Sequence, residues 1–455
     1  MKPDEQRTHA NSKLPVSQYP LRALFAIVAL TATVAAVAMD APAAYRAAII
    51  ASVCVLLWLT EWVRAWVPTV ILWISTPLLL GGFGAEFQPH EVLAWSADPI
   101  LILFLGGFSL AAAARLQGAD QVVASLTLRG SQGRPRRLVA LTALATAGLS
   151  MWMSNIAAAA MMLGALQPIL DGEPKESRIR RAVLLAVVLG ANVGGIATPI
   201  GSGPNGIAMA AVSKHQSIGF IEWMVFGVPL TLGLLLLSVG GMIVWLRPSG
   251  ATPVMSSPER PSGRLGSLAF VIGGTVILWL SEPVHGIPAW VVAIGTIIVL
   301  LASRLLRWSD VLNLDWSTLL LIAGGIGLGA LLDHSGLLSN LTDRLSLDAA
   351  PPTLRLLGLC FLSAFLSSLM SNTGTAALLI PLAATFDPSP STAIIVAISA
   401  SFGMLFVVST PPNAMAVSRG LPASDLLFPG LLLLIGGCLV VALSGPWVLQ
   451  AVGIP

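Results

Sequence analysis

Two short polar clusters interrupt long apolar stretches, and they are the residues best able to do chemistry. Ser371-Asn372-Thr373-Gly374-Thr375 lies within the apolar stretch 353–386, and Ser154-Asn155-Ile156 lies in the same setting within 138–170. Hydroxyl and amide groups find no hydrogen-bond partner among lipid tails, so each cluster is expected to face a cavity that is enclosed by protein and reachable by solvent. For either cluster alone, hydrogen bonding to a neighbouring helix is the simpler alternative.

Each polar cluster is followed by a long apolar segment that breaks at a Pro-Asn pair. The first break reads Gly201-Ser202-Gly203-Pro204-Asn205, and the second reads Thr410-Pro411-Pro412-Asn413. Glycine and proline interrupt a helix and expose backbone carbonyl groups. Because the clusters and the breaks occur twice in the same order, we favour a binding site over simple helix packing.

The composition is typical of a polytopic membrane protein. Apolar residues make up 56% of the 455 residues and charged residues only 10%, whereas soluble domains contain about 25% charged residues. The basic residues gather between apolar stretches, which indicates orientation in a membrane rather than nucleic-acid binding. The three cysteines lie in apolar stretches without metal-binding or redox spacing, so we expect them to be packing residues.

We predict an all-α protein with about 11 transmembrane helices and two re-entrant hairpins. The expected first-half elements are helices at 21–39, 44–63, 66–83 and 98–115, a hairpin at 137–170, a broken helix at 180–213 and a helix at 222–246. The expected second-half elements are helices at 267–282, 288–305 and 316–332, a hairpin at 353–386, a broken helix at 391–418 and a helix at 426–449. Without the first helix, the two halves have the same order, which predicts an internal repeat.

Loop charge predicts how the two halves are oriented. If each hairpin enters and leaves on one side, each half crosses the membrane five times, and the second half is inverted relative to the first. Five clusters of basic residues then fall on one side, in the leader, after 115, after 170, in the central linker and after 303, with Lys214 and Arg344 as isolated exceptions. The positive-inside rule makes that side the cytoplasm. We therefore expect an integral protein of a bacterial inner membrane, with a cytoplasmic tail at 1–19, a cytoplasmic linker at 247–264 and the C-terminus outside.

The polar groups of the hairpins and broken helices suit ion binding. No Asp, Glu, Lys or Arg lies at the centre of these segments, so a proton relay through membrane carboxylates has no candidate. Carbonyl, hydroxyl and amide oxygens suit a hard monovalent cation such as sodium, and half-helix N-termini suit an anion. Bound sodium would supply the positive charge that no basic side chain provides. The hairpins contain no nucleophile–base pair, so we expect neither an enzyme nor an organic cofactor.

At these motifs the chain closely resembles the divalent anion/sodium symporter family, over residues 44–450. The resemblance rests on the Ser-Asn-Thr tip, on the run 190–195 before the first break, on the Thr-Pro-Pro-Asn break and on the Gly-Gly pairs at 106–107 and 324–325. It implies sodium-coupled symport of a small dianion, a C4-dicarboxylate first and sulfate second, by an elevator movement within a homodimer. The transport domain would comprise 137–246 and 353–450, and the scaffold domain 20–116 and 265–332.

The resemblance also implies site residues. One sodium ion would bind at Ser150, Ser154, Asn155 and Gly201, and another at Asn372 and Ser409 with nearby carbonyl groups. The substrate would contact Asn155, Ser202, Asn372, Thr373, Thr410 and Pro411. Ile156 stands where the family has threonine, and a lost hydrogen bond to a charged group costs about 1.5–3 kcal/mol. Gly203, where the family often has proline, is expected to loosen the first break.

Two alternatives remain from the sequence alone. The same fold could exchange anions without sodium, or it could export arsenite or another ion, as other members of the wider superfamily do. The lack of a membrane carboxylate argues against proton exchange, and less strongly against arsenite export. The expected partners are a small dianion, sodium, membrane lipid and a second copy of the chain, but not nucleic acid.

Overall fold

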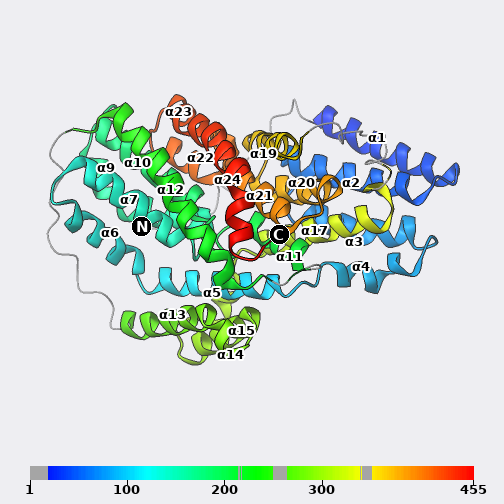
Figure 1. Cartoon of the computed structure of the whole chain (residues 1–455), viewed down its shortest axis with the longest axis horizontal. Coiled ribbons are helices and arrows are strands. Elements are labelled where there is room, and N and C mark those ends of the chain that lie inside the picture. The colour runs from blue at the N-terminus through cyan, green and yellow to red at the C-terminus, as the bar shows by residue number, and fades with distance from the viewer. Residues whose placement is uncertain are drawn as a thin grey trace, which may run out of the picture.

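The structure is a computed structural model, and it describes residues 19–213, 216, 218–249, 264–338, 340 and 351–454. Within these ranges all regular secondary structure is helical, as predicted. The predicted tail at 1–19 and linker at 247–264 lie outside the described residues, apart from their ends. Figure 1 shows an elongated body in which α11, α17, α20 and α21 meet near the middle.

The first half contains thirteen elements in the described part of the chain. They are α1 (Tyr19–Ala38), α2 (Ala43–Thr60), α3 (Val67–Leu80), η2 (Ala85–Phe87), α4 (Pro89–Trp95), α5 (Ile100–Leu116), α6 (Ala119–Ser131), α7 (Pro135–Ser150), α8 (Asn155–Ala165), α9 (Gln167–Gly172), α10 (Arg178–Gly194), α11 (Gly203–Ser213) and α12 (Phe220–Leu246). α7 and α8 form the first hairpin, and α10 and α11 are the two parts of the first broken helix.

The second half follows the same order. Its described elements are α13 (Leu265–Leu280), α14 (Glu282–His285), α15 (Ala289–Ala302), α16 (Trp308–Leu312), α17 (Trp316–His334), α19 (Pro352–Leu369), α20 (Asn372–Phe386), α21 (Pro390–Ala400), η4 (Val407–Ser409), α22 (Pro411–Ser418), η5 (Ala423–Leu426), α23 (Leu427–Leu431), η6 (Leu432–Gly437, a π-helical stretch) and α24 (Cys438–Ala451). α19 and α20 form the second hairpin, and α21 and α22 are the second broken helix.

The element bounds differ from the sequence prediction in several places. The basic segment between 115 and 137 contains a further helix, α6, and the helix expected at 98–115 continues from α4 across a 53° bend. Five described helices are long and apolar enough to cross a membrane, or six if the bent pair counts as one span. The other apolar helices have 10–17 residues, so the number of about 11 crossings stays a prediction.

The asparagine of each Pro-Asn pair holds its break in an irregular conformation. Asn205 Nδ2 donates to the carbonyl oxygens of Gly195 and Thr198, each at 2.8 Å. Asn413 Nδ2 donates to Met404 O at 3.1 Å and to Phe406 O at 2.8 Å. Carbonyl groups released from the helix ladder thereby regain partners inside the protein. The same residue type performs the same role in both halves.

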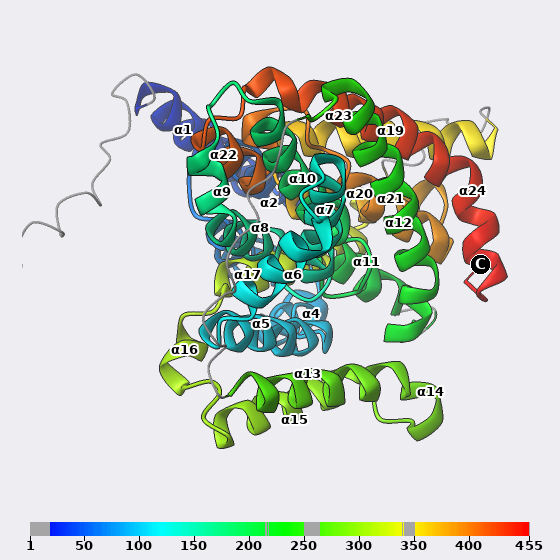
Figure 2. The same ribbon diagram turned by 90° about the vertical axis from the view of Figure 1, so that its left-hand side faces the viewer.

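The hairpin of each half packs against the broken helix of the other half. α8 contacts α22, and α20 contacts α11. α5 and α17 lie beside the second of these pairs, α20 and α11. Gly107 of α5 faces Ile200, and Gly325 of α17 faces Ala377 of α20. The first glycine of each Gly-Gly pair has a different neighbour. Gly106, for example, contacts Ala293 of α15. Figure 2 shows α13, α14 and α15 as a separate layer next to α4 and α5.

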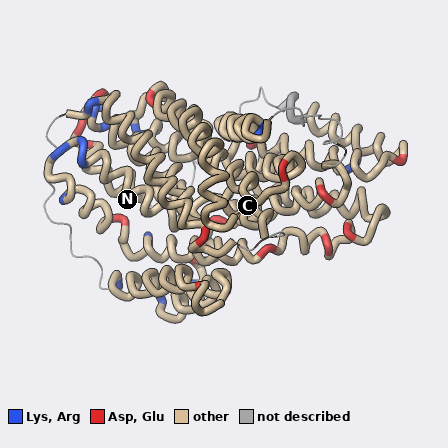
Figure 3. Tube along the Cα trace, viewed as in Figure 1, with Lys and Arg blue, Asp and Glu red and all other residues tan. Residues whose placement is uncertain are grey.

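Charged side chains are distributed unevenly along the molecule. Figure 3 shows Lys and Arg gathered at the end where α6 meets α7 and α9 meets α10. Several Asp and Glu lie at the opposite end, around α2, α3 and α4. Between these ends the described elements carry few charges, which is the pattern of a protein whose middle is surrounded by lipid.

Candidate functional site

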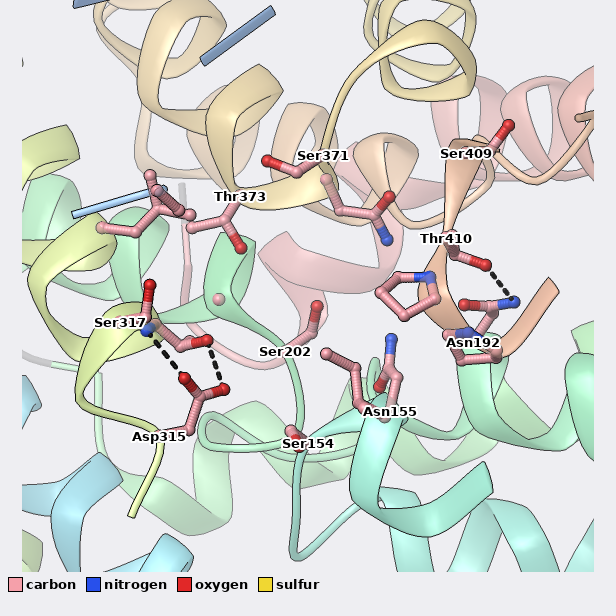
Figure 4. Close-up of a pocket in the computed structure, with 18 of the residues that line it drawn as sticks. Ser154, Asn155, Asn192, Ser202, Asp315, Ser317, Ser371, Thr373, Ser409 and Thr410 are labelled. Carbon is pink, nitrogen blue, oxygen red and sulfur yellow. Dashed lines mark hydrogen bonds between the residues drawn. The ribbon is translucent and has the colours of Figure 1, made fainter. Parts of the chain in front are cut away.

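A cavity of about 670 Å³ lies where the two hairpin turns meet the two breaks. Figure 4 shows Asn155 and Ser202 of the first half facing Thr373 and Thr410 of the second half. Nine of the ten predicted site residues line this cavity: Ser154, Asn155, Gly201, Ser202, Asn372, Thr373, Ser409, Thr410 and Pro411. The tenth, Ser150, lies directly behind Asn155, and its hydroxyl is 2.9 Å from that side chain.

Four helices begin at this cavity. The first residues of α8, α11, α20 and α22 all line it, namely Asn155, Gly203, Asn372 and Pro411. The two hairpin helices are capped alike, because Ser154 Oγ accepts a hydrogen bond from Ala157 N at 3.3 Å and Ser371 Oγ accepts one from Gly374 N at 3.1 Å. A helix N-terminus carries about half an elementary positive charge. The four helix starts therefore make the cavity attractive to an anion.

Oxygen atoms converge on the Asn155 side chain. One terminal atom of its amide lies 2.9 Å from Ser150 Oγ, 3.0 Å from Ala191 O and 3.3 Å from Gly201 O. With the amide nitrogen at this position, the three contacts are hydrogen bonds. Only this orientation satisfies both ends of the amide. The oxygens of Ser150, Ala191 and Gly201 are uncharged and of the type that hard cations bind, which is the donor set expected for the predicted sodium ion.

The second half repeats this arrangement. Ser367 Oγ lies 2.7 Å from Asn372 Oδ1 and 2.5 Å from Ala400 O, which matches Ser150 beside Asn155 and Ala191 O. Ser367 was not predicted as a site residue, although its position five residues before Asn372 equals that of Ser150 before Asn155. The hydroxyl of Ser409 donates to Ser368 O at 2.6 Å and accepts from Phe406 N at 3.0 Å, so it also supports the break.

Asn192 joins the two halves behind the cavity. Its Nδ2 lies 3.2 Å from Thr410 Oγ1 and 3.3 Å from Asn413 Oδ1, and Thr410 Oγ1 itself donates to Asn413 Oδ1 at 2.8 Å. Figure 4 shows the contact between Asn192 and Thr410. Asn192 is fully buried and also lines the cavity. Asn192 lies in the run 190–195 that carries the family resemblance, but its role could not be predicted, because a contact across 218 residues exists only in the folded chain.

The two hairpin tips differ at one position. Thr373 packs so closely on Gly203 that a Cβ there would collide with the threonine side chain. Ile156 occupies the corresponding place in the other hairpin, lines the cavity and is 43% exposed. Gly203 therefore makes room for Thr373, a role that helix propensity alone does not reveal.

Two carboxylates lie on the cavity wall. Asp315 caps α17, accepting hydrogen bonds from Thr318 N at 3.1 Å and Thr318 Oγ1 at 2.7 Å (Figure 4). Glu61 follows α2 in a left-handed conformation, and burial raises the pKa of its carboxyl group. None of the described residues that line the cavity is Lys, Arg or His. An anion held here would depend on helix starts, side-chain donors and bound cations.

Comparison with known proteins points to transport. The family described as "Citrate transporter" matches residues 55–393. An uncharacterized transporter of Haemophilus influenzae is 31% identical over 418 residues, which cover 86% of this chain and 88% of that protein. The sodium-dependent dicarboxylate transporter SdcS of Staphylococcus saprophyticus is 27% identical over 418 residues, covering 80% of this chain and 79% of that protein.

A solved structure shares the fold. The YdaH transporter of Alcanivorax borkumensis superposes with a TM-score of 0.55 and 14% sequence identity. The match covers 84% of this chain and 97% of that chain. Similarity at this level of identity concerns the arrangement of helices, not the substrate.

Proposed function

The chain belongs to the citrate transporter family, and from this premise we propose that it is a sodium-coupled symporter of small divalent anions, with C4-dicarboxylates as first and sulfate as second candidate. Membership makes it an integral membrane transporter and agrees with the resemblance that its motifs indicated. The observation that carries the proposal is the cavity at which four helices begin, lined in the described structure by no basic side chain. The similarity to a sodium-dependent dicarboxylate transporter supports it.

The substrate would bind at the two hairpin tips. Asn372 and Thr373 present an amide and a hydroxyl at the start of α20, and Ser202 lies beside the start of α11. Asn155, Thr410 and Pro411 complete the proposed set. Hydrogen bonds to charged groups contribute about 1.5–3 kcal/mol each, so a few of them suffice for micromolar binding of a dianion.

Sodium would be co-transported at the two serine–asparagine–carbonyl clusters. The first cluster comprises Ser150, Asn155 and the carbonyl groups of Ala191 and Gly201, with Ser154 at the helix cap. The second comprises Ser367, Asn372 and Ala400 O, with Ser409 nearby. Because Asn155 and Asn372 belong both to these clusters and to the cavity wall, ion binding would orient the amides that meet the substrate. Binding of sodium and binding of the substrate would thereby be coupled.

We assign the cavity opening to the cytoplasmic side. Glu61 and Asp315 line the cavity. They lie in the same inter-helix segments as Arg64 and Arg307, which loop charge places in the cytoplasm. Transport would proceed by movement of 137–246 and 353–450 against a scaffold of 20–116 and 265–332, each protomer paired with a second copy. In this view the structure represents the inward-facing state.

Uptake into proteoliposomes tests the proposed function. Labelled succinate and labelled sulfate are offered with an inward sodium gradient and, in parallel, with choline in place of sodium. We expect sodium-dependent succinate uptake, weaker sulfate uptake and no succinate uptake by the Asn372→Ala variant, while Asn313→Ala, which alters an exposed asparagine after α16, transports normally. Failure of both anions to accumulate would refute the assignment.

Sodium-independent exchange is a second candidate, favoured by one observation. The Asn155 amide can satisfy Ser150, Ala191 and Gly201 by donating hydrogen bonds, with no ion present. If exchange operates, uptake persists in choline and accelerates when the vesicles are loaded with unlabelled substrate. That result would replace symport while leaving the assigned anion site in place.

A further inference from the structure

The two ends of the cavity are unequal as anion subsites. We define subsite A as the junction of α20 with α11, and subsite B as the junction of α8 with α22, since these helices pack in pairs. Subsite A presents Thr373 packed on Gly203, with Ser202 adjacent. It therefore offers two hydroxyl groups and the N–H of a glycine at a helix start, all of which can donate to a carboxylate.

Subsite B has lost the corresponding donors. Ile156 replaces the threonine at the hairpin tip, and α22 begins with Pro411 and Pro412, which have no backbone N–H. The hydroxyl of Thr410 already donates to Asn413 Oδ1 at 2.8 Å. Asn155 and the start of α8 remain as the polar groups of this subsite.

Hydrocarbon takes the place of those donors. Ile156 is 43% exposed and Val408 is 73% exposed, and both line the cavity together with the exposed ring of Pro411. A ligand that covers apolar side chains exposed in a binding site removes them from water, which strengthens binding. The cavity volume of about 670 Å³ leaves room beyond the carbon chain of a C4-dicarboxylate.

We propose that the preferred substrate is a dicarboxylate that carries a hydrocarbon branch next to one carboxylate. The unbranched end binds at subsite A, the other carboxylate binds Asn155 and the start of α8, and the branch covers Ile156 and Pro411. This inference rests on the proposed transport of dianions and narrows it to one class. It makes Ile156 a specificity-determining residue.

Binding to purified full-length protein at saturating sodium tests the inference. The probes are succinate, 2-methylsuccinate and glutarate, of which the last two are isomers that differ only in where the extra carbon lies. We expect 2-methylsuccinate to bind about fourfold more tightly than succinate, the effect of one buried methyl group, and glutarate to gain nothing. Equal affinity for the two isomers would overturn the inference.

Two variants locate the effect at subsite B. Ile156→Thr removes hydrocarbon and adds a donor, so it should bind succinate more tightly and lose the preference for 2-methylsuccinate. The matched change at subsite A, Thr373→Val, should weaken both ligands and keep their ratio. A preference that survives in Ile156→Thr would contradict the role of Ile156, whereas absence of binding for all three dicarboxylates would count against the proposed function itself.

Discussion

At the scale of single residues, Gly203 links backbone geometry to anion binding. Thr373 occupies the space where a Cβ of residue 203 would lie. In Gly203→Ala the threonine must therefore leave its position at the start of α20, and its hydroxyl is lost to the ligand. A hydrogen bond to a charged group is worth about 1.5–3 kcal/mol, so we expect succinate affinity to fall at least tenfold in a calorimetric titration.

A matched glycine separates this effect from a general loss of helix flexibility. Gly148 lies within α7, and a Cβ there would meet no atom within 4 Å. Gly148→Ala should leave succinate affinity unchanged. Normal affinity in Gly203→Ala would mean that Thr373 does not contact the substrate.

Asn192 provides a second prediction at this scale. Its two N–H groups point to Thr410 Oγ1 and Asn413 Oδ1 across the junction of the halves. Asn192→Asp keeps the shape but replaces donors by acceptors and places a negative charge beside an anion site. We expect it to lower succinate affinity more than Asn192→Ala does, by more than tenfold. Equal succinate affinities in the two variants would show that a charge at residue 192 does not affect anion binding in the cavity.

Most of the site could be predicted because its asparagines and serines form short polar clusters inside otherwise apolar stretches. Ser154, Asn155 and Asn372 stand out against apolar surroundings. Polar groups within a membrane must bond to other protein groups or face a cavity, so these residues were candidates for a binding site. Asn192 is as polar, but its significance lies in a partner 218 residues away. Ser367 resembles the other serines of α19 in the sequence, and its contact with Asn372 Oδ1 distinguishes it in the structure.

At the scale of elements, the hairpins and breaks were recognised in their right order, whereas α6 was not. Its sequence mixes Arg129 and Asp120 with apolar residues, so no apolar stretch marks it. The bend between α4 and α5 was also missed. Hydropathy detects long segments that face lipid. It does not reliably detect helices that lie on the protein surface, or bends between helices.

An ion pair ties the first broken helix to η5, the segment that follows the second broken helix. Arg181, in the first turn of α10, contacts both carboxylate oxygens of Asp425 in η5, at 2.5 and 2.6 Å. Asp425 is almost fully buried, whereas the side chain of Arg181 is 26% exposed. Removal of the arginine leaves a buried carboxylate without its partner, which we expect to cost about 2–3 kcal/mol after allowance for solvent screening.

Thermal unfolding in detergent checks this prediction. Arg181→Ala should lower the melting temperature, and addition of Asp425→Asn should recover part of the loss because no charge is then buried alone. Arg178→Ala, which changes an exposed arginine one turn earlier on α10, is the control. A melting temperature that falls equally in Arg178→Ala would mean that the ion pair contributes nothing specific.

At the scale of the whole molecule, the sequence predicted a site built from both halves but not how the halves pack against each other. The repeated order of elements indicates two similar units, but it does not say that each hairpin packs on the broken helix of the other unit. That exchange places Thr373 against Gly203. It also explains why one cavity, rather than two, contains both hairpin tips.

An aromatic stack connects the proposed transport domain to the proposed scaffold. Trp152 at the tip of the first hairpin and Phe220 of α12 both stack on Trp279 of α13, with centroids 6.2 and 4.8 Å from that of Trp279. Glu282 adds a second link, because its carboxylate lies 3.5 Å from Phe220 N and 3.3 Å from Ala289 N. The stack lies at the start of α12 and the end of α13. These helix ends are the ones farther along the chain from the predicted cytoplasmic linker at 247–264.

An outward movement of the transport domain must break this stack. Each aromatic pair contributes about 0.5–1.5 kcal/mol, so Trp152→Ala should shift the balance from inward-facing to outward-facing protein by roughly two- to tenfold.

Val408→Cys reports this balance, since Val408 is 73% exposed in the cavity and the three native cysteines are buried. An impermeant maleimide should label this cysteine faster from the cytoplasmic side, and Trp152→Ala should slow that labelling and speed labelling from outside. Trp245→Ala removes an aromatic pair that α12 makes with Phe428, inside the proposed transport domain, and should leave both rates unchanged. If Trp152→Ala also leaves them unchanged, the stack does not hold the inward-facing state.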